Sequence, residues 1–109
     1  MKIEKEITEL GCTIILSGRL DAVTAPELEG AMEGVLSEGQ TRVIMNLTEL
    51  EYISSAGLRV FLIGAKKLKA VKGELILAGM TPTTKEVIRI SGFPSIMPCF
   101  DTMAQVPTP

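Results

Sequence analysis

The sequence contains no histidine and no tryptophan, and aromatic residues make up only 4% of it. Without histidine the chain cannot assemble a Ser-His-Asp triad or a Cys-His pair, and it lacks the commonest ligand of transition metals. The formal net charge is −2, with no basic stripe and no set of stacking aromatics, so nothing favours nucleic acid as a partner. These absences disfavour several catalytic and binding classes before any motif is considered.

Long apolar runs are also missing. No run reaches the roughly 18 residues of a membrane span, and the charged start of the chain has no signal-peptide core, so we expect a cytoplasmic protein without membrane insertion. Cys12 and Cys99 lie far apart outside any CxxC pattern, which predicts two buried free thiols. With 109 residues, of which 46% are hydrophobic, the chain has the size and apolar content of one compact domain.

Apolar runs separated by turn-forming residues predict a small α/β domain. We expect strands at residues 3–8, 12–17, 42–47 and 74–78, and a short edge strand within 96–100, where Pro98 excludes a central position. Residues 18–23 are expected to form a turn. Helices alternate with strands after the first hairpin, so the sheet should be mixed, with about four or five strands and a parallel centre.

Apolar residues at intervals of three and four predict three helices. The first begins at Thr24, with Glu27 completing a capping box, and ends at Gly39. The second follows Ser54 and Ser55 and ends at Gly73. The expected core-facing residues are Leu28, Met32, Val35 and Leu36; Leu58, Phe61, Leu62, Ala65 and Leu68; and Val87, Ile88 and Ile90. The order is ββαβαβα with an optional βα ending, and the tail at 107–109 should fray.

The most informative segment is Tyr52–Gly64, where an apolar run changes to helical periodicity at Ser54-Ser55-Ala56-Gly57. One serine is expected to cap the helix, its oxygen accepting a backbone N–H, while the other lies in the first exposed turn. Free N–H groups and the helix dipole favour added negative charge there, and small residues let a partner approach the backbone. The step is therefore either an ordinary cap or a phosphorylatable switch.

Five segments together resemble the STAS family, and more narrowly the bacterial anti-sigma factor antagonists. They are Gly18–Asp21, Asn46–Leu47, Tyr52–Arg59, Gly73–Leu77 and Ile90–Phe93. The resemblance covers about residues 3–106 in the family's order and spacing. It implies a single STAS-like domain over residues 1–109, with a small mixed sheet packed against three or four helices.

The resemblance also implies a function. In that family the anti-sigma factor is a serine kinase that phosphorylates its antagonist at the start of this helix. The unphosphorylated antagonist binds the kinase and frees the sigma factor, and a serine phosphatase restores this form. The common family motif is Asp-Ser-Ser-Gly, so alignment on Gly57 makes Ser55 the phosphate acceptor and puts Ser54 in place of the aspartate. Ala56 replaces the second serine, and Ser54 is a secondary acceptor candidate.

Residues around this motif are implied to contact the partner. The predicted partner-binding set is Asp21, Thr24, Ser54, Ala56, Gly57 and Arg59. Simpler roles stay open for three of them: Thr24 as a helix cap, Asp21 as the acceptor of an Asx-turn, and Arg59 as an ordinary exposed charge. Neither a metal nor a cofactor is expected, and the free protein is expected to be a monomer.

Two other functions compete with the phospho-switch. A STAS subunit could act without phosphorylation, as a scaffold bound to a transport ATPase or a stress-signalling complex. An enzyme is disfavoured, since Asp21, Glu49 and Glu51 show no paired spacing for acid–base work and no Walker-type phosphate loop occurs. We therefore expect a binding protein with no catalytic residues.

Overall fold

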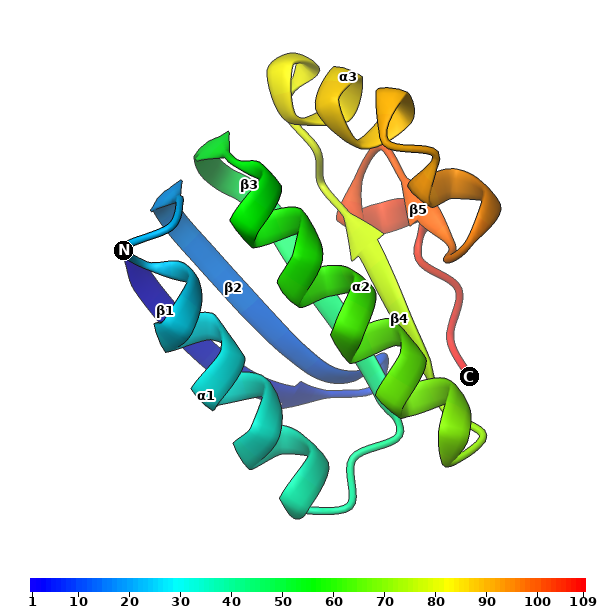
Figure 1. Cartoon of the computed structure of the whole chain (residues 1–109). Coiled ribbons are helices and arrows are strands. Elements are labelled where there is room, and N and C mark those ends of the chain that lie inside the picture. Colours follow the sequence, from blue (N-terminus) through cyan, green and yellow to red (C-terminus); the bar gives the residue numbers. More distant parts are fainter.

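The computed structural model describes residues 1–109, which form one five-stranded sheet with helices packed against it (Figure 1). The strands are β1 Lys2–Thr8, β2 Gly11–Leu20, β3 Arg42–Ile53, β4 Glu74–Ala78 and β5 Cys99–Phe100. They lie in the order β1-β2-β3-β4-β5. β1 runs antiparallel to β2, and every other pair is parallel. The predicted α/β class and the mixed sheet with a parallel centre are confirmed.

Two helices cover one face of the sheet. The helices are α1 Ala25–Ser37, α2 Ser55–Ala70 and α3 Pro82–Ile90, with 3₁₀ turns at Phe93–Ser95 and Met103–Gln105. α1 and α2 lie side by side across the sheet (Figure 1). Between them and the strands lies the main core, which includes Leu16, Leu28 and Phe61, all fully buried. The optional βα ending is present only as the two-residue β5 and a single 3₁₀ turn.

β3 is longer than predicted because two bulges hide its strand character in the sequence. Its pairing with β2 shifts register twice, so that β3 carries extra residues opposite β2. Each bulge adds a residue to one strand and displaces the alternation of its faces. Buried residues consequently recur at every third position, Leu47, Leu50 and Ile53, instead of every second. The prediction that the strand ends at residue 47 is therefore wrong.

The turn predicted at residues 18–23 is also shorter than expected. β2 continues through Gly18 and Arg19 to Leu20, which is fully buried and pairs with Ile53. Gly18 has a φ of +98°, a conformation that glycine adopts without steric penalty. The loop that links β2 to α1 is thereby reduced to residues 21–24.

The buried face of α2 differs in part from the predicted stripe. Phe61 and Leu68 are buried as expected, but two glycines, Gly57 and Gly64, also face the core. The predicted residues Leu58, Leu62 and Ala65 are only half-buried at its edges. In α3, Ile90 is 70% exposed and does not belong to the core. Periodicity located both helices, whereas their exact orientation depends on where small residues allow close packing.

The end of α2 uses Gly73 differently from the prediction. The helix ends at Ala70, and Lys72 takes the left-handed conformation with a φ of 62°. The Gly73 N–H then donates to the Leu68 carbonyl at 2.7 Å, as in a Schellman motif. A Cβ on Gly73 would lie only 2.1 Å from the Thr41 carbonyl oxygen. Glycine is required here for close approach, not for backbone freedom.

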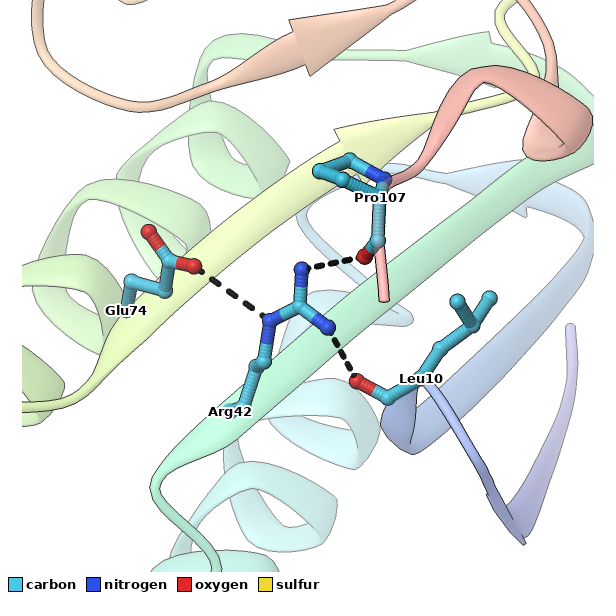
Figure 2. A network of polar contacts seen from close by, with 4 residues as sticks. All are labelled: Leu10, Arg42, Glu74 and Pro107. Carbon is cyan, nitrogen blue, oxygen red and sulfur yellow. Dashed lines mark hydrogen bonds and ion pairs between the residues drawn. The ribbon is translucent and has the colours of Figure 1, made fainter. Parts of the chain in front are cut away.

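The opposite face of the sheet carries a smaller apolar cluster closed by the C-terminal segment. Val106 packs there with Ile44 and Ile76. Arg42 fastens this segment: its guanidinium donates to the Pro107 carbonyl at 2.6 Å and to the Leu10 carbonyl at 2.7 Å (Figure 2). Pro107 is therefore held in place, and the predicted fraying of the tail is wrong at this residue.

Replacing Gly73 by alanine is expected to lower the free energy of unfolding by about 2 kcal/mol or more, because the new Cβ would overlap the Thr41 carbonyl. Gly34→Ala is the matched control, since a Cβ at this exposed helical position meets nothing within 4 Å. The control should gain up to about 1 kcal/mol from helix propensity. Urea unfolding followed by circular dichroism measures both changes. A Gly73→Ala protein as stable as wild type would contradict the packing described.

Candidate functional site

The parallel pairing of β2 and β3 brings two helix starts together. Parallel strands end at the same edge of a sheet, and here β2 leads into α1 while β3 leads into α2. The Ser54 N–H donates to the Leu20 carbonyl at 2.9 Å, and this bond links the start of α2 to the end of β2. The loop containing Asp21 and Thr24 therefore lies beside the start of α2, although more than 30 residues separate the two in the sequence.

The two serines occupy different environments. Ser55 is the first residue of α2 and its side chain is exposed. Ser54 is the N-cap residue with extended backbone (φ −100°, ψ 174°), yet its side chain makes no capping hydrogen bond. Its hydroxyl oxygen is sealed from solvent and has no hydrogen-bond partner in the chain. The predicted cap is thus wrong, and the first-turn N–H groups have no side-chain acceptor.

The start of α2 is electrostatically positive. Its first turn contains no acidic residue, so no side chain of this turn offsets the helix dipole or the free N–H groups. Arg59 is exposed one turn further along α2 and lines the same shallow groove as Ser55 and Ala56. From α1 and the loop before it, Ala22 and Pro26 form the opposite wall. An anion on Ser55 would lie beside the free N–H groups of this turn, in a groove lined by Arg59 and also by Glu29 of α1.

Hydrogen bonds fix the loop before α1. Asp21 Oδ1 accepts from the Val23 and Thr24 N–H groups at 3.0 and 3.1 Å, which confirms the Asx-turn. These bonds, that of Thr24 first, lower the pKa of the Asp21 carboxyl below its ordinary value. The Thr24 hydroxyl turns away from α1: it donates to the Arg19 carbonyl at 2.7 Å and accepts from the Asp21 N–H at 2.9 Å.

This geometry corrects the predicted capping box. Thr24 is the N-cap residue of α1, but its side chain makes no capping bond to the helix. The hydroxyl is held by the strand end at Arg19 instead, so Thr24 shapes the loop. One effect that the sequence did not indicate is the presentation of Val23, whose side chain is 84% exposed on this fixed loop. The sequence signal that could have revealed this exposed side chain is a large apolar residue placed between Asp21 and Thr24, within the Asx-turn.

The predicted partner-binding residues divide into surface and interior groups. Arg59 is exposed, and Asp21, Thr24 and Ala56 are half-buried. Gly57 is buried, and a Cβ there would lie 2.6 Å from Leu20 Cγ, so the absence of a side chain allows α2 to approach β2. The contact of a partner with Gly57 stays a prediction. Arg19 lies over the Tyr52 ring at 4.2 Å and forms a second polar surface at the same edge.

Groups suited to other chemistry are not assembled. No cluster of three or more His, Cys, Asp or Glu residues could hold a metal ion. Cys12 is buried, Cys99 is half-buried, and both are free thiols. Burial raises the pKa of the Cys99 thiol to about 11, which disfavours the reactive thiolate. None of the helices combines the length and the apolar character that crossing a membrane requires.

Comparison with known proteins agrees with this fold. The model of the STAS domain family matches residues 2–106. The chain belongs to the STAS family. This STAS protein is 46% identical over 83 residues to BtrV of Bordetella bronchiseptica, whose name marks it as a proposed anti-sigma factor antagonist. The match covers 76% of the chain and 72% of BtrV.

Two further relatives carry similar names. The anti-sigma-B factor antagonist of Listeria monocytogenes is 32% identical over 84 residues, covering 77% of this chain and 74% of the relative. The anti-sigma factor antagonist SpoIIAA in its unphosphorylated form is 26% identical, with a TM-score of 0.71 over 91% of this chain and 86% of that one. SpoIIAA of Bacillus has also been solved in a phosphorylated form, at 27% identity and the same TM-score, over 90% of each chain.

The lowered pKa of Asp21 predicts a pH-dependent contribution to stability. A carboxyl whose pKa is lower in the folded state stabilises the fold at higher pH and loses this effect as the pH falls through the folded pKa. The difference in unfolding free energy between wild type and Asp21→Asn should therefore be constant from about pH 5 to 7 and shrink below about pH 4. Urea unfolding at several pH values measures it. A difference that grows on acidification would contradict the Asx-turn.

Proposed function

We propose that this STAS protein is an anti-sigma factor antagonist that is switched by phosphorylation of Ser55. Its unphosphorylated form binds an anti-sigma factor that is also a serine kinase, and this binding releases the sigma factor in the cytoplasm. The exposed Ser55 side chain at the uncapped start of α2 is the observation that supports the proposal most. The names of the relatives support the same class of function.

The exposure of the two serines favours Ser55 over Ser54 as the acceptor. In the transfer, the Ser55 hydroxyl oxygen forms a bond to the γ-phosphorus of ATP and the bond to the β-phosphate oxygen breaks, leaving ADP. The hydroxyl proton passes to a base of the kinase. The Ser54 oxygen has no accessible surface and could not reach a donor without a change of conformation. A serine phosphatase reverses the modification by hydrolysis.

Electrostatics then provide the switch. A phosphoryl group adds roughly −1.5 to −2 charges at neutral pH and three strong acceptors. In the free protein these groups lie beside the first-turn N–H groups, in the groove that Arg59 lines together with Glu29. A partner that covers this groove must remove the phosphoryl group from water next to the apolar residues Ala22 and Ala56. Desolvating the added charge weakens the complex, and the anti-sigma factor returns to the sigma factor.

The partner is proposed to contact the surface around this groove. Arg59, Ala56, Asp21 and Thr24 form this surface, together with the exposed side chain of Val23. Ser54 and Gly57 act indirectly, since they lie inward and set the position of α2. Truncating Val23 to alanine leaves the loop hydrogen bonds intact, because they involve its backbone only. The free protein is proposed to be a monomer.

A serine-to-alanine pair tests the assignment. The anti-sigma factor kinase and ATP should transfer one phosphoryl group to wild type and to Ser54→Ala, and none to Ser55→Ala. Ser55→Asp should bind the kinase at least about tenfold more weakly, a loss of about 1.4 kcal/mol. Intact mass spectrometry and calorimetric titration measure these outcomes.

Two results would contradict the proposal. Equal labelling of Ser55→Ala and wild type would remove Ser55 as the acceptor. Co-purification of the native protein with a transport ATPase in place of a kinase would favour the unphosphorylated STAS scaffold. Ser55 is exposed, and the buried Ser54 hydroxyl makes no hydrogen bond that alanine would remove, so none of the three variants should unfold the domain. Circular dichroism provides the control for folding.

A further inference from the structure

The seam between α1 and α2 is an open groove longer than the site around Ser55. One hollow lies next to Ser55, and a second follows it along the seam as far as Leu36 and Lys67. Both are lined by Glu29, Val60 and Ile63, so they form one continuous groove. From Ser55 to Lys67 the wall formed by α2 is about 18 Å long at 1.5 Å per residue.

Gly64 and Met32 pack together at the second hollow. A Cβ on Gly64 would lie 2.7 Å from Met32 Cε, so the missing side chain leaves the space that the end of Met32 occupies. Leu36 and Val60 complete an apolar lining around this point. Methionine adapts its shape easily, and such surfaces accommodate an inserted apolar side chain. An apolar side chain of a partner can therefore enter here by displacing the flexible end of Met32.

The two rims of the groove carry opposite charges. Glu29 and Glu33 lie four residues apart on α1, and Arg59 and Lys67 lie two turns apart on α2. None of the four forms an ion pair within the chain. Unpaired charges that are segregated by sign along an apolar groove define both the chemistry and the orientation of a complementary partner.

We propose that this groove binds an amphipathic helix of about twelve residues from the anti-sigma factor, and this inference rests on the proposed function. An apolar ridge of that helix inserts along Val60 and Gly64, a basic flank faces the acidic rim on α1, and an acidic flank faces the basic rim on α2. In a second copy of the chain, the helix that lies outside this groove is a poor match. This helix, α3, has nine residues and exposes only Ile90 as a large apolar side chain.

Filling the hollow is the first test. Gly64→Ala should push the flexible end of Met32 into the groove and weaken binding of the anti-sigma factor kinase at least about tenfold in calorimetric titration. Gly34→Ala on the other side of α1 should bind like wild type, because its Cβ meets nothing and lies outside this groove. Gly64→Ala that binds as tightly as wild type would overturn the role of the hollow.

The second test reverses the charge of Lys67 or of the adjacent Lys66, and neither change involves the core. Lys67→Glu reverses a rim charge and should weaken binding at least about fivefold. Lys66→Glu makes the same change in net charge at an exposed position that does not line the groove, and should have little effect. Equal effects of the two variants would attribute the loss to net charge and overturn the oriented groove.

Hydrogen exchange on the bound kinase tests the occupant. The proposal expects protection of one amphipathic helix with opposite charges on its two flanks; protection of a strand or loop alone would overturn it.

The proposed function and the proposed groove can fail separately. Wild-type protein that neither binds the kinase nor becomes phosphorylated overturns the proposed function. Wild-type protein that binds and is phosphorylated, while Gly64→Ala and Lys67→Glu bind equally well, overturns the groove alone.

Discussion

The hydrogen bond from the Ser54 N–H to the Leu20 carbonyl fixes the start of α2 against the end of β2. It continues the parallel pairing of β2 and β3, which persists through two shifts of register to Leu20 and Ile53. Gly57 adds to this constraint, because the absence of a side chain lets the first turn pack directly on Leu20. The position of Ser55 is therefore set by the sheet and the core, and less by the preferences of its own loop.

Two hydroxyl groups that could cap helices do not do so. The Thr24 hydroxyl bonds to the Arg19 carbonyl, and the Ser54 hydroxyl is sealed without a partner. An unpaired buried hydroxyl costs about 1–3 kcal/mol, which the surrounding packing must offset. The consequence is a hydrogen-bonded loop next to a helix start whose N–H groups have no side-chain cap. On this account added charge, and not refolding, changes what the surface can bind.

The sequence predicted the features that depend on local pattern. Apolar periodicity and turn residues identified the mixed α/β sheet and the helix ending at Gly39, which has a φ of +81°. The predicted strand ended too early because the bulges of β3 place buried residues at every third position instead of every second. The requirement for glycine at position 73 comes from Thr41, a neighbour remote in sequence, and no local pattern contains it. The sequence identified Ser55 as the candidate serine. The orientation of the Ser54 hydroxyl depends on contacts that form only in the fold.

Amide hydrogen exchange at the start of α2, measured by NMR on the unphosphorylated protein, tests the central constraint most directly. The Ser54 N–H donates to the Leu20 carbonyl, so it should exchange slowly, with protection close to that of the neighbouring strand amides. The exposed Ser55 has no side-chain acceptor for its N–H, so this amide should exchange orders of magnitude faster. A fast Ser54 amide, or a Ser55 amide protected as strongly as Ser54, would contradict the account.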